Sequence, residues 1–390
     1  MELARRIRQI PPSATLALNA KANQLKAQGV DVVNFGVGEP DFDTPKNIRK
    51  AAIKAIEDGF TRYTPVGGIL ELKEAIIKTF HDRYHLSYSP AEIMVSCGGK
   101  HALYNLFQVI FDQGDEVVVP APFWVSYPPM LMLAEAKPVI IPTREENGFK
   151  LTAEELKAQL TPKTKGLILN SPSNPTGMVY TQAELEALAE VVLAHNLLVI
   201  SDDIYDRILF DGASFVNLAM LSPELKARTF VLNGLSKTYA MTGWRMGYGV
   251  MPQFLVEAVN KLMVNSNSCT ASFTQRAGIA ALDGPQDETR KMVAEFRRRR
   301  DAFVDGLNSL PGFRCARPLG AFYAFPNVQG TGWESKKLAD ALLAEAGVAC
   351  VDGACFGAYG EGYIRFSYAN SYERLMEAVE RIRKFLTAGR

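Results

Sequence analysis

The sequence predicts an α/β fold: a mostly parallel central sheet with helices on both faces, plus a smaller α+β domain. Between about residues 90 and 250, short apolar runs alternate with segments of helical periodicity. Such alternation is typical of the crossover units that build parallel sheets. The last hundred residues carry a different pattern, in which long helical segments outnumber short strands. A chain of 390 residues is long enough for two domains.

Six strands are expected in the first of these regions. Each is a short, continuous apolar run, as expected for a strand that is covered on both faces. The expected strands are 93–96, 116–119, 138–141, 166–169, 197–201 and 229–232. A helix is expected over 100–111, directly after the glycine pair that follows the first strand.

Two capping boxes mark the starts of further helices. Thr152 pairs with Glu155, and Thr181 pairs with Glu184, in each case with the spacing that satisfies free backbone N–H groups at a helix start. The second helix carries a single apolar stripe of Leu185, Leu188 and Val192. These helices are expected to be the crossovers between strands.

The C-terminal region is expected to form the smaller domain. Its predicted elements are a helix over about 286–309, a strand-like turn at 320–323, a helix over 336–346, a strand at 363–367, and a final helix with Leu375, Val379, Ile382 and Leu386 on one face. The N-terminal segment is too short to fold alone and is expected to pack on this domain. The predicted division is therefore 1–40, 41–285 and 286–390.

The charge balance excludes one large class of function. The chain has 43 Lys and Arg residues against 42 Asp and Glu, a formal net charge of +1. Proteins that bind nucleic acids depend on an excess of positive charge. A basic run at 297–300 is expected to be a solvated helix face, because apolar residues flank it at helical spacing.

Cysteine and histidine usage points to a reducing compartment. Five cysteines are scattered without a C-x-x-C pair, and only four histidines are present. We therefore expect neither a disulfide scaffold nor a metal site. The first residues lack the apolar core of a secretory signal, and no apolar run reaches the ~18 residues of a membrane span. These observations predict a cytoplasmic protein without membrane or nucleic-acid partners.

One segment suggests a specific chemistry. Ser236-Lys237-Thr238-Tyr239 is followed by Thr242-Gly243-Trp244-Arg245, which places an amine and a guanidinium eight positions apart. A lysine can form a Schiff base with an aldehyde, and an arginine can hold a phosphate with two parallel hydrogen bonds. Both tasks are needed to bind an aldehyde cofactor that carries a phosphate.

Other polar or aromatic residues follow the predicted strands. Ligands of open parallel sheets bind beyond the carboxyl ends of the strands. The residues that follow five of the strands are the pair Gly98 and Gly99, Trp124, Asn174, Asp202 and Lys237. We expect these residues to meet at one edge of the sheet.

Several motifs resemble the signatures of class I aminotransferases, which are fold-type I pyridoxal-phosphate enzymes. The motifs are Asn-Pro-Thr-Gly (174–177), Ser-Asp-Asp-Ile-Tyr (201–205), Ser-Lys-Thr-Tyr-Ala-Met-Thr-Gly-Trp-Arg-Met-Gly-Tyr (236–248), Tyr-Ile-Arg-Phe-Ser-Tyr-Ala (363–369) and Trp-Val-Ser-Tyr-Pro (124–128). The similarity extends from about Pro12 to the C-terminus, and within the family it is greatest to bacterial aspartate aminotransferases. It implies pyridoxal 5′-phosphate as the cofactor.

The resemblance implies that Lys237, Asp202 and Tyr205 are catalytic and that Asn174 binds the cofactor beside them. Lys237 resembles the lysine that forms the Schiff base and moves the proton. Asp202 resembles the carboxylate that pairs with the pyridine nitrogen, although Asp203 stands beside it where the family usually has Glu. Tyr205 and Asn174 resemble the donors to the phenolic oxygen of the cofactor.

The resemblance also implies a wider cofactor-binding set. Arg245, Ser236 and the glycine pair 98–99 would hold the phosphate, with Lys100 next to them. The position three before the lysine is Gly234, where many relatives have a phosphate-binding serine. Trp124 would stack on the pyridine ring. Tyr63 would reach the phosphate of the neighbouring subunit, which implies a homodimer with shared active sites.

Substrate contacts follow from the same resemblance. Arg365 would hold the α-carboxylate, near Gly38, Asn174 and Trp124. Lys100 and Thr15 match positions that face the distal carboxylate of a dicarboxylic substrate. Without the resemblance, Lys100 would be read as a helix residue that points at solvent.

The expected activity is transfer of an amino group between L-aspartate and 2-oxoglutarate by a ping-pong Schiff-base mechanism, in amino-acid metabolism and biosynthesis. The alternatives are an aminotransferase of the same fold acting on aromatic amino acids, alanine or prephenate, or a pyridoxal-phosphate β-lyase. A cofactor-binding regulatory module is a further alternative, but it needs a DNA-binding segment that the short N-terminus does not offer.

Overall fold

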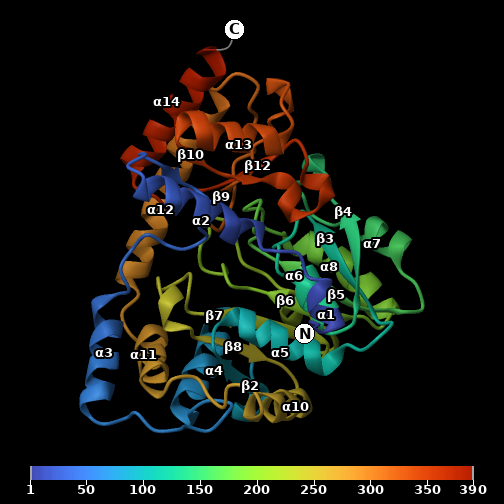
Figure 1. The fold of residues 1–390 in the computed structure, drawn as a ribbon. Helices are drawn as coiled ribbons and strands as arrows, with labels where there is room; N and C mark the ends of the chain where they lie inside the picture. The colour runs from blue at the N-terminus through green and yellow to red at the C-terminus, as the bar shows by residue number, and fades with distance from the viewer. Residues whose placement is uncertain (1, 389–390) are drawn as a thin grey trace.

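The computed structural model describes residues 2–388, and its centre is a seven-stranded sheet of order β2-β8-β7-β6-β5-β3-β4 (Figure 1). The strands are β2 (Ile93–Ser96), β3 (Glu116–Ala121), β4 (Lys137–Pro142), β5 (Thr164–Asn170), β6 (Leu198–Asp202), β7 (Thr229–Gly234) and β8 (Gly247–Val250). All six predicted strands are confirmed to within two residues at each end. β8 is the antiparallel member and pairs with both β2 and β7.

Helices cover both faces of this sheet, as predicted, because neighbouring residues of a strand point to opposite faces. In β3, Val117 and Val119 pack in one apolar cluster and Val118 in another. The first face is covered by α5 (Gly99–Ile110), α6 (Tyr127–Leu133) and α10 (Gln253–Val264). The other face is covered by α3 (Lys46–Glu57), α4 (Leu70–Tyr84), α7 (Ala153–Gln159), α8 (Gln182–Ala194), α9 (Pro223–Lys226) and α11 (Ser272–Asp283).

The C-terminal elements gather beyond one end of the large sheet, in orange and red at the top of Figure 1. They comprise α12 (Asp287–Asn308), α13 (Ser335–Ala346), α14 (Tyr372–Ala388) and a three-stranded antiparallel sheet of β9 (Tyr323–Ala324), β11 (Val351–Asp352) and β12 (Ile364–Ser367). The expected α+β character is confirmed.

The N-terminal segment packs on these C-terminal elements. It contains α1 (Arg5–Arg8), α2 (Ala14–Ala27) and β1 (Val33–Asn34), and β1 pairs in parallel with β10 (Val348–Ala349). Phe35 stacks on Phe303 of α12 at 5.3 Å between ring centroids. The domain boundaries near residues 41 and 286 remain predictions.

The expectation for the basic run 297–300 is wrong for half of its residues. Arg297 and Arg298 are exposed, but Arg299 and Arg300 are buried in α12 with side chains 8% and 1% exposed. Carboxylates from distant segments explain the difference. Asp41 pairs with Arg299 at 2.7 Å, and Asp211 pairs with Arg300 at 2.7 Å. A buried guanidinium is tolerated when it is paired in this way.

Two further features concern the chemistry of the whole chain. All five cysteines are free thiols. Within residues 2–388, no helix combines the length and the apolar character needed to cross a membrane.

Candidate active site

A cavity of about 350 Å³ lies where the carboxyl ends of the parallel strands face the N- and C-terminal elements. The predicted site residues that line it are Thr15, Gly38, Gly99, Lys100, Trp124, Asn174, Asp202, Tyr205, Ser236, Lys237, Arg245 and Arg365. The strands β5, β6 and β7 end at Asn170, Asp202 and Gly234, so the loops that follow them reach the cavity together. The fold therefore brings most of the residues that were predicted from the sequence into one site.

Lys237 lies three residues beyond the end of β7 and lines this cavity. The surrounding protein lowers the pKa of its amine to about 8, because burial disfavours the charged form. Glu39 opposes this effect, while Arg245 and Arg365 add to it. The Nζ atom donates a hydrogen bond to the Gly38 carbonyl. A lysine with such a pKa has a useful fraction of free amine near neutral pH, as a nucleophile or base requires.

Asp202 and its neighbour Asp203 point to different places. Asp202 lines the cavity and accepts a hydrogen bond of 2.7 Å from the hydroxyl of Tyr127. Burial raises the pKa of Asp202 to about 6, and the Tyr127 bond works against that rise. Asp203 instead accepts hydrogen bonds from Ser201 at 2.6 Å and Asn217 at 2.7 Å. Of the two carboxylates, only Asp202 can meet a group bound in the cavity.

Tyr205 makes a hydroxyl–hydroxyl contact of 2.7 Å with Tyr323, and both side chains are buried. Tyr205 lies three residues beyond β6, whereas Tyr323 begins β9 of the C-terminal sheet. Gly38 lies against the same pair, because a Cβ atom there would stand 2.5 Å from the Tyr323 hydroxyl. The contact thus joins three distant segments at the cavity.

Arg365 extends from β12 into the cavity and is buried. Its guanidinium donates to the Asn174 side chain at 3.1 Å and to the Gly36 carbonyl at 2.7 Å. Its Nε atom is buried and has no partner among the described residues. An unsatisfied buried donor on a cation is a place for an anion, and a carboxylate matches the geometry of a guanidinium.

The start of α5 offers a second place that suits an anion. Gly98 caps this helix with a φ of 89°, and a Cβ atom there would lie 2.5 Å from Nη2 of Arg245. Free N–H groups at a helix start and a guanidinium beside them suit a phosphate. Gly234, which replaces the family's serine, packs against the backbone of Gly247, 3.1 Å from where its Cβ would be.

Lys100 is exposed at the mouth of the cavity, with its Nζ atom 4.8 Å from the ring centroid of Trp124. Partial burial and the nearby Arg245 lower the pKa of its amine. Thr15 reaches the cavity from α2 and shares a contact of 3.1 Å with Ser13. Lys100 therefore adds a further cation to the site, besides the buried Arg365 and the Arg245 guanidinium.

Two predicted residues, Gly98 and Tyr63, do not line the cavity; Gly98 directly precedes the lining residue Gly99, and Tyr63 belongs to no part of the lining. The Tyr63 side chain is 90% exposed. Conversely, Glu39, Tyr127 and Tyr323 line the cavity although no sequence pattern gives their side chains a role. Tyr127 lies inside the motif that begins at Trp124, but that motif does not predict a function for its hydroxyl group. Tyr323 has only its place in a predicted turn.

The family of the chain follows from comparisons with known proteins. A family model described as "Aminotransferase class I and II" matches residues 30–382. The chain belongs to this family, and it is therefore a transaminase, an enzyme that acts on amino acids and 2-oxo acids.

Within this family, the chain is similar over nearly its full length to proteins named as aspartate or aspartate/prephenate aminotransferases. The chain is 50% identical over the full length of both proteins to the aspartate aminotransferase of Geobacillus stearothermophilus. It is 45% identical to the aspartate/prephenate aminotransferase of Nitrosomonas europaea, over 99% of this chain and 100% of the relative. The solved structure of an aspartate aminotransferase from Rhizobium meliloti is similar with a TM-score of 0.96 at 42% identity, over 99% of each chain.

Proposed function

We propose that this protein is a pyridoxal 5′-phosphate-dependent aminotransferase that exchanges the amino group between L-aspartate and 2-oxoglutarate. The observation that carries the proposal is that two cations, Arg365 and Lys100, line one cavity with the lysine Lys237. A dicarboxylic substrate presents two carboxylates, and each cation can take one. The names of the Geobacillus and Rhizobium proteins support the same assignment.

The residues present fit the cofactor. Gly98 has no Cβ, so the Arg245 guanidinium can lie close to the helix start, and the two together can hold one phosphate. Gly99, Ser236 and Arg245 line the cavity at this point. Asp202 offers a carboxylate for a ring nitrogen.

Three further side chains complete the cofactor site. Trp124 offers an aromatic face, while Tyr205 and Asn174 offer donors for a phenolic oxygen. When bound, pyridoxal 5′-phosphate supplies an aldehyde carbon and a protonated ring that withdraws electrons from the α-carbon of the substrate.

The side chains of this protein bind the substrate and move the proton. Arg365 binds the α-carboxylate with two parallel hydrogen bonds, which fixes the direction of the Cα–H bond. The Nζ atom of Lys237, with its pKa near 8, takes the proton from Cα and returns it at the cofactor side. Asp202 remains ionised above its pKa of about 6 and keeps the ring nitrogen protonated. Lys100 attracts the distal carboxylate, and Thr15 lines the same cavity.

The proposal includes a homodimer in the cytoplasm. The exposed side chain of Tyr63 would reach the phosphate in the neighbouring subunit, so each active site would need both chains. Its 90% exposure in a single chain supports this role, because an aromatic side chain so exposed is available to a partner. We also propose the division into residues 1–40, 41–285 and 286–390.

A second substrate preference has support of its own. The Nitrosomonas relative is named an aspartate/prephenate aminotransferase, which makes prephenate, a dicarboxylate with a ring, an alternative amino acceptor. Aromatic amino acids and alanine are less suited to the site, because they leave Lys100 without a carboxylate. A β-lyase activity would leave the same cation unused.

Steady-state kinetics test the proposal. With 2-oxoglutarate as acceptor, kcat/KM for aspartate should exceed the values for phenylalanine and alanine, and prephenate should be tried as acceptor with aspartate as donor. Equal values for the three donors would contradict the assignment. Release of pyruvate and ammonia from cysteine without any 2-oxo acid would favour the lyase instead.

A further inference from the structure

The buried guanidinium of Arg300 joins three separate segments of the chain. It donates to the Asp301 carboxylate of its own helix at 2.9 and 2.5 Å. It also donates to the Pro318 carbonyl at 2.9 Å and pairs with Asp211 at 2.7 Å. Its carbon lies 4.8 Å from the ring centroid of Phe210. The side chain is only 1% exposed, so these contacts replace its solvent.

Two of the joined segments also pair with each other. Leu209 and Gly320 form an antiparallel bridge. On either side of it, the Phe210 amide donates to the Leu319 carbonyl and the Ala321 amide donates to the Ile208 carbonyl, both at 2.9 Å. The segments 208–211 and 318–321 therefore form a short two-stranded pair, and Arg300 lies at its outer end.

The inner end of this pair is at the cavity. The segment 208–211 continues back to Tyr205, and 318–321 continues forward to Tyr323. The hydroxyls of these two tyrosines meet at 2.7 Å. The pair also abuts the loop that carries Asn174, because the Gly177 carbonyl accepts the amides of Leu319 and Gly320 at 3.0 and 2.9 Å.

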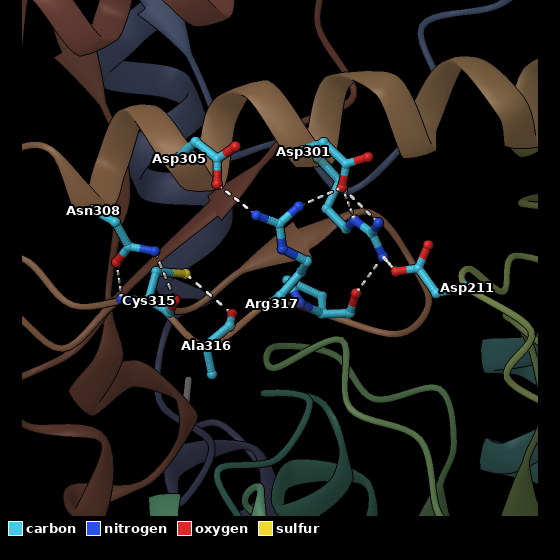
Figure 2. Close-up of polar contacts among 9 residues, drawn as sticks. Asp211, Asp301, Asp305, Asn308, Cys315, Ala316 and Arg317 are labelled. Carbon is cyan, nitrogen blue, oxygen red and sulfur yellow. Dashed lines mark hydrogen bonds and ion pairs between the residues drawn. The ribbon is translucent and has the colours of Figure 1, made fainter.

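The charges around Arg300 extend this connection along α12. Figure 2 shows Arg317 between Asp301 and Asp305, with Asp211 on the far side of the cluster. Arg317 donates to Asp301 at 2.8 Å and to Asp305 at 2.5 Å. The Asp211 carboxylate is also shared with the exposed Arg297 at 2.9 Å. Because Asp211 and Asp301 are each held by a second arginine, the guanidinium of Arg300 has a single well-defined place.

We propose that Arg300 is a positioning residue for the amino-transfer site: its guanidinium fixes the pairing of 208–211 with 318–321 and thereby places the Tyr205 hydroxyl in the cavity. The proposal rests on the proposed function, in which Tyr205 donates to the phenolic oxygen of the cofactor. Arg300 itself lines no part of the cavity and acts only through the paired segments.

The test compares Arg300→Met with Arg297→Met in the purified holoenzyme. Arg297 also pairs with Asp211 but is exposed, and within residues 2–388 it makes no other ion pair or side-chain hydrogen bond, which makes it a matched control. One readout is the pH midpoint of the cofactor absorption band, with Tyr205→Phe as reference. The other is hydrogen exchange in peptides covering 207–212 and 318–323, which does not depend on the cofactor chemistry.

We expect Arg300→Met to raise the midpoint by about one unit, the size of one hydrogen bond to a charged group. Arg297→Met should leave it unchanged, and Arg300→Met should add nothing to Tyr205→Phe. Exchange in the two peptides should accelerate only in Arg300→Met. Should this variant fail to fold, Asp211→Asn takes its place with the same expectations, because it removes the carboxylate that pairs with Arg300 from the segment 208–211.

A folded Arg300→Met protein with the wild-type midpoint and wild-type exchange would overturn the inference, as would a shift that adds to that of Tyr205→Phe. The proposed function would instead be contradicted if the wild-type protein had no pH-dependent band. It would also be contradicted if Tyr205→Phe left the midpoint of that band unchanged. In that case the exchange of the two peptides alone decides whether Arg300 holds the pairing.

Discussion

The hydroxyl of Tyr127 donates a hydrogen bond of 2.7 Å to the carboxylate of Asp202, and both groups are buried. The bond connects the start of α6 with the end of β6, two elements that are 75 residues apart along the chain. It stabilises the ionised carboxylate, which burial alone would disfavour. Tyr127 therefore extends to lower pH the range over which Asp202 carries its charge.

Tyr127→Phe should move the acidic limb of the pH profile of kcat/KM upward by about one unit, because a hydrogen bond to a charged group is lost. Asp202 then needs a higher pH to ionise, so the loss of activity should be large near pH 6 and small near pH 8. Tyr359→Phe, at a tyrosine that is 58% exposed, is the control. An unchanged acidic limb in Tyr127→Phe would show that this bond does not control the charge of Asp202.

Asp203 should matter for stability rather than for catalysis. Burial, with repulsion from Asp206 and Asp202, raises the pKa of its carboxyl to about 8, despite the bonds from Ser201 and Asn217. An unfolded aspartate ionises near pH 4, so between about pH 4 and 8 the folded state holds the extra proton. Stability due to this group therefore falls as the pH rises through that window.

Asp203→Asn removes this titration without changing the shape of the side chain. Between pH 5 and pH 8, the urea midpoint of the variant should rise relative to that of the wild type. Its kcat/KM should stay within a few-fold of the wild-type value. Asp202→Asn, the neighbouring change, should lower kcat/KM by about 100-fold or more, because it removes the carboxylate in the cavity. A constant difference in midpoint across the pH range would mean that Asp203 is ionised throughout.

Lys100→Ala should discriminate between substrates. The variant loses the exposed cation beside Trp124, and with it a charged contact of about 1.5–3 kcal/mol to the distal carboxylate. We expect kcat/KM for aspartate to fall by about 10- to 100-fold and that for alanine to change little. Equal losses for aspartate and alanine would assign Lys100 to the cofactor rather than to the substrate.

Gly98→Ala should weaken cofactor binding. A Cβ atom at Gly98, where φ is 89°, would stand 2.5 Å from the Arg245 side chain, so any side chain there displaces the guanidinium. Gly114→Ala is a matched control with a φ of 96° and no atom within 4 Å. Fluorescence titration with the cofactor should give at least a tenfold weaker Kd for Gly98→Ala, whereas Gly114→Ala should only lose about 1 kcal/mol of stability. Equal affinities in the two variants would contradict a phosphate site at Gly98.

The sequence predicts the parallel strands well, because strands buried on both faces are continuous apolar runs. β8 escapes prediction because Gly247 and Gly249 make up half of it, and glycine is depleted in strands. These glycines are needed for packing: a Cβ at Gly247 would collide with the backbone of Gly99. A close approach between distant segments leaves no periodic signal in the sequence.

The same reason explains the errors at single residues. Tyr127 and Tyr323 act through contacts with Asp202 and Tyr205, which come from distant parts of the chain. Arg300 resembles part of a solvated helix face in the sequence, because its neighbours along the chain do not reveal that Asp211 pairs with it. Motifs locate residues that touch a ligand, but they do not identify the residues that hold those in place.

The proposed function requires a covalent bond between Lys237 and the aldehyde of the cofactor. Reduction of the holoenzyme with borohydride, followed by proteolysis and mass spectrometry, detects that bond. We expect the mass of one reduced cofactor to appear on the peptide that contains Lys237 and to disappear in Lys237→Ala. A label on Lys100 or any other lysine, or no label at all, would contradict the proposed function.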